Sequence, residues 1–62
     1  MDILEARTIL GVDADTGWPE VRRAYRERIR AAHPDVSDRA DAAGASARLT
    51  LAYATLRRVR DA

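Results

Sequence analysis

Apolar residues recur at helical spacing in three segments of the chain, and no segment alternates as a β-strand would. The last segment shows the clearest pattern, because steps of four and three place its apolar residues on one side of a helix. These residues are Ala45, Leu49, Ala52, Leu56 and Val59, with Tyr53 beside them. We expect this helix to begin between Asp38 and Asp41 and to run to about Arg60, with Gly44 weakening its first turns.

The first ten residues predict a short helix. Asp2 can cap its start, and Glu5 stands at the capping-box spacing. Gly11 suits the end of the helix, because glycine readily adopts the left-handed conformation there. The apolar side of this helix consists of Ile3, Ala6, Ile9 and Leu10.

A second helix is predicted from about Trp18, after the turn-favouring loop VDADTG, to a point before Pro34. At about 100° per residue its apolar residues share one face, which should contact the last helix. They are Val21, Ala24, Tyr25, Ile29 and Ala32. Arg28 projects into this face, so we expect its stem to pack while its head reaches an edge, toward an acid in the first helix or near the C-terminus. Trp18 should pack at the edge of the core, and Tyr53 should belong to the core.

These patterns predict an all-α fold. The second and third helices form an antiparallel hairpin, and the short first helix packs on it. The 62 residues are expected to make one domain, residues 1–62. A chain of this size buries only about 60% of its unfolded surface, which leaves a small core and no deep pocket. A dedicated enzyme active site is therefore disfavoured, and we predict no catalytic residue and no small-molecule substrate.

The amino-acid composition excludes several kinds of functional site. The chain has no cysteine, which excludes disulfides, thiolate zinc sites and a cysteine nucleophile. A single histidine among scattered aspartates does not make a metal site. No apolar run approaches the roughly 20 residues that span a bilayer, and MDILEARTIL lacks the apolar core of a signal peptide. We expect a cytoplasmic protein with no metal, no cofactor and no membrane contact.

The charges are unevenly distributed. Eleven arginines oppose ten acidic residues for a net charge of +1. Four of the arginines in the second predicted helix, Arg22, Arg23, Arg26 and Arg30, fall on one face. This basic stripe points along the helix axis toward the corner between the two longer helices, where His33, Pro34 and Asp35 stand in sequence. A solvated surface would explain the stripe alone, but a stripe that ends at such a corner favours a partner-binding site.

Four sequence segments together resemble a known family. They are ILGV (residues 9–12), VRRAYRE (21–27), HPD (33–35) and LAYATL (51–56). In this order and at nearly this spacing, they make the chain similar to a short and divergent J-domain, the module of DnaJ-type co-chaperones. The chain departs from the family pattern at Arg28, which aligns with a leucine, and at Ser46, which aligns with a core phenylalanine.

The resemblance implies a helical hairpin that carries HPD in its connecting loop. Such a module binds a DnaK-type, seventy-kilodalton heat-shock chaperone and stimulates its ATP hydrolysis without catalytic residues of its own. By this resemblance Arg22, Arg23 and Arg26 would meet an acidic chaperone surface, and Tyr25 occupies the position of the family's helix-two tyrosine.

The same resemblance gives the corner its roles. Asp35 would pair with a chaperone arginine, Pro34 would fix the loop, and His33 would brace the corner or contact the partner. The predicted partner-binding residues are therefore His33, Pro34, Asp35, Arg22, Arg23, Tyr25, Arg26 and Arg30.

Two alternatives remain open at this stage. The chain could be a J-like adaptor that binds another protein, or that binds a chaperone without stimulating it. An arginine-rich helix also suits nucleic acid, but the net charge of +1 and the acids Glu20 and Glu27 disfavour that interpretation. We expect a monomer.

Overall fold

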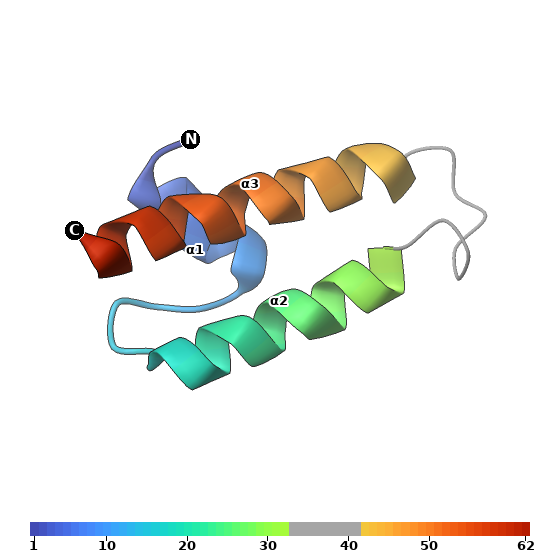
Figure 1. Ribbon diagram of the computed structural model, residues 1–62. Coiled ribbons are helices and arrows are strands. Elements are labelled where there is room, and N and C mark those ends of the chain that lie inside the picture. Colours follow the sequence, from blue (N-terminus) through green and yellow to red (C-terminus); the bar gives the residue numbers. More distant parts are fainter. Residues whose placement is uncertain (33–41) are drawn as a thin grey trace.

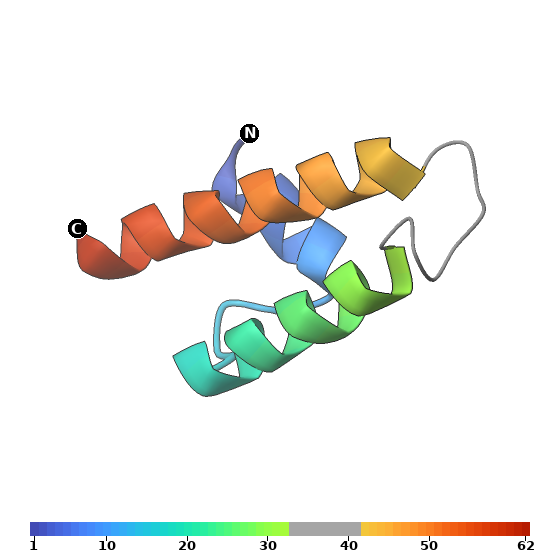
Figure 2. The same ribbon diagram turned by 45° about the vertical axis from the view of Figure 1, so that its right-hand side comes forward.

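The computed structural model describes residues 1–32 and 42–62, with side chains in the second range from residue 44 onward. These ranges hold three α-helices and no strand. The helices are α1 (Ile3–Leu10), α2 (Trp18–Ala32) and α3 (Ala42–Asp61). Figures 1 and 2 show α2 and α3 running antiparallel, with α1 packed against α3. The all-α prediction is confirmed.

Both ends of α1 form as its sequence predicts. Asp2 Oδ1 accepts a hydrogen bond from the Glu5 backbone N–H at 2.7 Å, which satisfies one donor left open at the helix start. Gly11 closes the other end with φ at 70°, in the left-handed region. The Gly11 N–H donates to Thr8 O at 3.2 Å and the Val12 N–H to Arg7 O at 3.0 Å. This pair of bonds is a Schellman motif.

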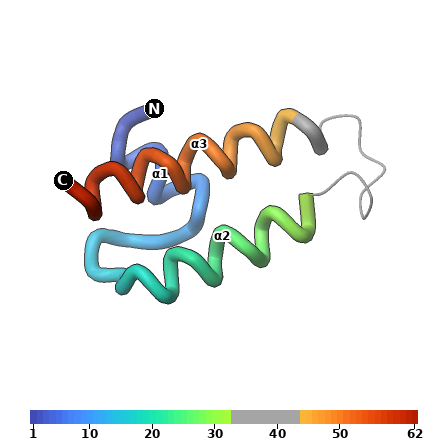
Figure 3. The backbone as a smooth tube through the Cα atoms, viewed as in Figure 1, coloured from blue at the N-terminus to red at the C-terminus, as the bar shows by residue number. Residues whose placement is uncertain are grey.

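The loop from α1 to α2 is held by its own polar side chains. Asp13 Oδ1 accepts from the Asp15 N–H at 2.9 Å and from the Thr16 hydroxyl at 3.0 Å. The Thr16 Oγ1 in turn accepts from the Asp13 N–H at 3.0 Å. Figure 3 traces this loop past the C-terminal end of α3, so that α2 begins beside the last turns of α3.

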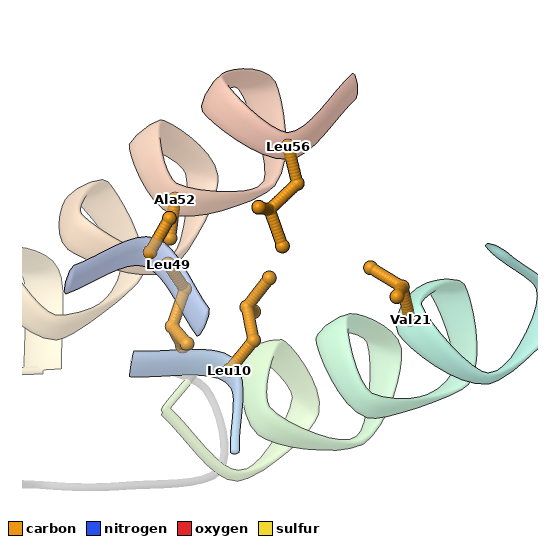
Figure 4. Close-up of a cluster of buried hydrophobic side chains, with 6 residues drawn as sticks. Leu10, Val21, Leu49, Ala52 and Leu56 are labelled. Atoms are coloured by element: carbon orange, nitrogen blue, oxygen red, sulfur yellow. The ribbon is translucent and has the colours of Figure 1, made fainter. Parts of the chain in front are cut away.

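A small apolar core lies where the three helices meet. Its buried members are Ala6, Leu10, Val21, Leu49, Ala52 and Leu56. Figure 4 shows Leu10, Val21 and Leu56 extending into one space from three different helices. Ala6 and Ala52 are completely buried, and their small side chains let α1 and α3 approach closely.

The predicted apolar face of α2 is confirmed. Val21 is buried, and Tyr25, Ile29 and Ala32 pack partly buried against the core. Ala24 is also partly buried.

The predicted apolar stripe of α3 is wrong at its two ends. Ala45 is exposed, and Val59 is 45% exposed. Ile3 on α1 is likewise exposed. The two ends of α3 are exposed because α1 has only eight residues and covers only part of the 20-residue α3. The helix ends near the predicted residue, whereas the predicted start lies outside the described residues.

The partner predicted for Arg28 is also wrong. Its head does reach an edge, but Arg28 Nε donates to the backbone carbonyl of Leu10 at 3.0 Å and not to a carboxylate. The acids of α1 and its cap, Asp2 and Glu5, stand at the start of that helix. Arg28 reaches the opposite end, where unpaired carbonyls offer acceptors.

Candidate partner-binding surface

Four arginines share one exposed face of α2, as the helical spacing predicts. Arg22, Arg26 and Arg30 follow one another at intervals of four residues, and Arg23 lies beside this row. With Pro19 and Glu27 they line one open depression on the surface. We call Arg22, Arg23, Arg26 and Arg30 the arginine face.

The arginine face is strongly basic. Among the described residues, Glu27 is the single acid that lines the same depression. Within residues 1–32 and 42–62, none of the four arginines forms an ion pair with an acidic side chain. A face of this kind attracts an acidic surface and directs the hydrogen-bond donors of four guanidinium groups to it.

Tyr25 lies elsewhere, in the seam between α2 and α3. Its ring stacks on that of Tyr53, with centroids 4.3 Å apart and planes at 16°. Its hydroxyl lies 3.5 Å from Thr50 Oγ1. The structure therefore does not bring Tyr25 to the arginine face, and a direct contact between Tyr25 and a partner stays a prediction.

The stack continues beyond Tyr25. Trp18 lies on Tyr53 at 5.2 Å between ring centroids, and the Arg60 guanidinium carbon lies 4.9 Å from the centre of the Trp18 ring. Arg60, Trp18, Tyr53 and Tyr25 thus alternate between α3 and α2, and we call them the aromatic ladder. Sequence reasoning placed Trp18 at the edge of the core and Tyr53 in the core, and both pack partly buried against it. It missed Arg60. The i, i+7 spacing of Tyr53 and Arg60, like that of Trp18 and Tyr25, is the signal that could have revealed it.

The corner itself lies outside the described residues. His33, Pro34 and Asp35 directly follow Ala32, the last residue of α2. The Ser46 hydroxyl donates to the carbonyl of Ala32 at 3.4 Å, so α3 holds the end from which the corner departs. Sequence reasoning noted Ser46 only as a departure from the family pattern and missed this contact.

Metal binding and membrane insertion find no support in the described residues. In residues 1–32 and 42–62, no three His, Cys, Asp or Glu side chains gather closely enough to hold a metal ion. None of the helices described is both long enough and apolar enough to cross a bilayer.

Comparison with known proteins identifies the family to which the chain belongs. The DnaJ domain profile matches residues 7–61. The chaperone protein DnaJ of Methanothermobacter thermautotrophicus is 48% identical over 48 residues, which are 77% of this chain and 13% of that protein. The DnaJ of Haloarcula marismortui is 56% identical over 34 residues, or 55% of this chain and 9% of that protein. The DnaJ of Exiguobacterium sibiricum is 44% identical over 48 residues, again 77% and 13%.

The matched segment is thus a small part of each of these relatives, 9–13% of their length. None of the solved structures matches the chain significantly.

Proposed function

The chain belongs to the DnaJ domain family, and from that premise we propose that it binds a DnaK-type chaperone and stimulates its ATP hydrolysis. The observation that supports this proposal best is the arginine face, which runs along α2 toward the residue that precedes the HPD tripeptide. We propose that residues 1–62 act as one domain, monomeric and cytoplasmic.

In this proposal the arginine face docks first. Its guanidinium groups meet an acidic surface of the chaperone, and the opposite charges raise the association rate more than the final affinity. Arg22, Arg26 and Arg30 form a row that leads toward the corner, so docking of this row brings His33 close to the chaperone. The contact should weaken with salt, because exposed charges are screened over about 8 Å at physiological ionic strength.

The corner then acts on the chaperone. Proline restricts φ at Pro34, so the segment loses little conformational freedom when it binds. Asp35 is proposed to pair with an arginine of the chaperone, and His33 to brace the loop or contact the partner. The hydrogen bond from Ser46 to Ala32 supports this role, since it restrains the end of α2 directly before the corner.

ATP hydrolysis in this scheme belongs to the chaperone. J-domains are regulatory modules, and this chain is proposed to change the partner's conformational equilibrium by binding one state better than the other. No residue of the chain is required to touch the nucleotide.

A second function is supported by the departures from the family pattern. Ser46 stands where the family has a core phenylalanine, and Arg28 where it has a leucine. A domain altered in this way could bind a chaperone, or another protein, without stimulating hydrolysis. Nucleic-acid binding is disfavoured, because Glu27 places a negative charge within the arginine face.

The deciding experiment is single-turnover ATP hydrolysis by a DnaK-type chaperone from the same source, with the domain added over a range of concentrations. The wild-type chain is expected to accelerate hydrolysis, and Asp35→Asn to abolish the acceleration. The paired substitution Arg22→Gln/Arg26→Gln should raise the concentration needed for half-maximal stimulation. Arg58→Gln, on the exposed outer side of α3, serves as the matched control and should change nothing.

Two results would contradict the proposal. Full stimulation by Asp35→Asn would remove the role of the corner. Absence of stimulation by a wild-type chain that is folded by circular dichroism would remove the activity, and fluorescence anisotropy with the labelled domain would then decide between an adaptor that binds the chaperone and one that does not.

A further inference from the structure

Arg28 joins the middle of α2 to the end of α1. Its Nε donates to Leu10 O at 3.0 Å, although the residue as a whole is exposed. The guanidinium group covers Gly11, because a Cβ atom added to that glycine would overlap Arg28 Nη2. The two helices are therefore linked by a side chain with a fixed planar head.

The Leu10 carbonyl needs such a donor. The Schellman motif at this end of α1 uses the carbonyls of Arg7 and Thr8, which accept from Val12 and Gly11. The Leu10 carbonyl receives no bond within that motif and takes its hydrogen bond from Arg28. A cation at this position also faces the negative end of the helix dipole, which favours it.

Arg28 stands on the opposite side of α2 from the arginine face. Arg26 and Arg30 are each two residues away, which places them about 160° around the helix from Arg28. Arg22 and Arg23 lie about 120° and 140° away. A bond that holds Arg28 against α1 therefore determines the direction in which the arginine face points.

We infer that Arg28 is a positioning residue, which sets the rotation of α2 about its own axis and so aims the arginine face at its partner. The aromatic ladder restrains α2 on the α3 side, through Tyr25 and Trp18. Arg28 restrains it on the α1 side. Around the axis of α2, Arg28 lies on one side of buried Val21 and Tyr25 on the other. The two contacts together therefore oppose rotation of α2 in both directions.

The size of the effect follows from helix geometry. At a helix radius of about 5–6 Å, a roll of about 20° moves a group on the surface by about 2 Å. Charged hydrogen bonds tolerate a range of only about 0.5 Å in length. A modest roll would therefore misplace several guanidinium groups at once. The role in partner binding rests on the function proposed above, whereas the role in orienting α2 does not.

Gly11 and Arg28 act together in this arrangement. Glycine accepts φ at 70° and leaves room for the guanidinium group above it. Leucine, the family residue that aligns with Arg28, has no donor for Leu10 O. The arginine thus gives this chain a link between α1 and α2 that an apolar residue cannot form.

The test compares Arg28→Leu with Arg58→Leu, a matched removal of an exposed arginine from α3. Residual dipolar couplings measured on the isotopically labelled 62-residue chain report the orientation of each helix. In Arg28→Leu the couplings measured within each helix should still agree with the wild-type structure of that helix. The couplings of α2 should show that it has rotated relative to α1 and α3. Arg58→Leu should keep all three orientations. Destabilisation alone would not produce this result, because the couplings are measured on folded protein.

A second measurement uses the chaperone. In the hydrolysis assay, Arg28→Leu should raise the half-maximal concentration by about threefold to tenfold, because a reoriented arginine face docks more weakly. The maximal rate should stay unchanged, because the HPD tripeptide is intact. Wild-type values for both the α2 orientation and the half-maximal concentration would overturn the inference.

The outcomes separate the two proposals. If the wild-type chain does not stimulate hydrolysis, the proposed function fails, and the couplings alone still decide whether Arg28 orients α2. If Arg28→Leu does not fold, Arg28→Met carries the same measurement, since methionine keeps an unbranched stem and has no donor for Leu10 O. An unchanged α2 orientation in Arg28→Met would then refute the inference.

Discussion

Replacing Tyr53 with leucine should destabilise the hairpin more than its partial burial suggests. Tyr53 is the central ring of the aromatic ladder, with Tyr25 4.3 Å away on one side and Trp18 5.2 Å away on the other. Each aromatic pair contributes about 0.5–1.5 kcal/mol beyond the area it buries. Because leucine keeps much of the apolar volume but makes neither stack, Tyr53→Leu should lower the free energy of unfolding by about 1–3 kcal/mol.

This loss is large for so small a domain. At about 0.05–0.15 kcal/mol per residue, a chain of 62 residues is stable by about 3–9 kcal/mol. With a urea dependence of about 1 kcal/mol per molar, Tyr53→Leu should lower the unfolding midpoint by about 1–3 M. Urea titrations followed by far-ultraviolet circular dichroism measure this shift.

Double-mutant cycles divide the effect between the two stacks. Combining Tyr53→Leu with Tyr25→Leu, and separately with Trp18→Leu, should give coupling energies of about 0.5–1.5 kcal/mol each. The control is Leu51→Ala, because Leu51 is 52% exposed on α3 and its truncation should change stability by less than about 0.5 kcal/mol. Additive substitutions, or a Tyr53→Leu effect no larger than the control, would refute the importance of the ladder.

The remaining predictions concern the core, the helix cap and the charged surface. Leu10→Ala should cost about 2–5 kcal/mol, because Leu10 is only 1% exposed at the centre of the core, and circular dichroism at 25 °C should show a large loss of helix. Asp2→Ala should cost about 0.5–2 kcal/mol and lower the Tm, whereas Asp2→Asn should be nearly neutral because asparagine caps equally well; equal effects of the two would show that the cap is unimportant. Raising salt from about 0.05 to 0.5 M should weaken stimulation by the wild-type chain more steeply than by Arg22→Gln/Arg26→Gln, and parallel salt curves would show that the arginine face does not dock.

Helix boundaries were predictable wherever a local signal determined them. Asp2 and Gly11 delimit α1 because an N-cap side chain and a left-handed glycine act on the backbone within a few residues. The start of α2 at Trp18 was predictable because the loop VDADTG ends directly before it, and because Pro19 suits the first turn of a helix. The grouping of Arg22, Arg23, Arg26 and Arg30 was equally predictable, because residues on one helix are separated by fixed angles.

The contacts between helices were less predictable. Arg28 was expected to find a carboxylate, and it bonds to the carbonyl of Leu10. Val59 was expected in the core and is 45% exposed. Both errors have one cause, because the partner of a side chain depends on which part of another helix lies opposite, and periodicity within a single helix does not contain that register.

The sequence by itself determined three helices, the residues that form the basic face of α2, and the family to which the chain belongs, because all three depend on local spacing along the chain. Only the tertiary structure decided that Tyr25 stacks on Tyr53 in the seam, that Arg60 extends the ladder, and that Arg28 caps α1. These contacts join residues 18 to 42 positions apart. They exist only when the packing of a small core has brought the helices into register.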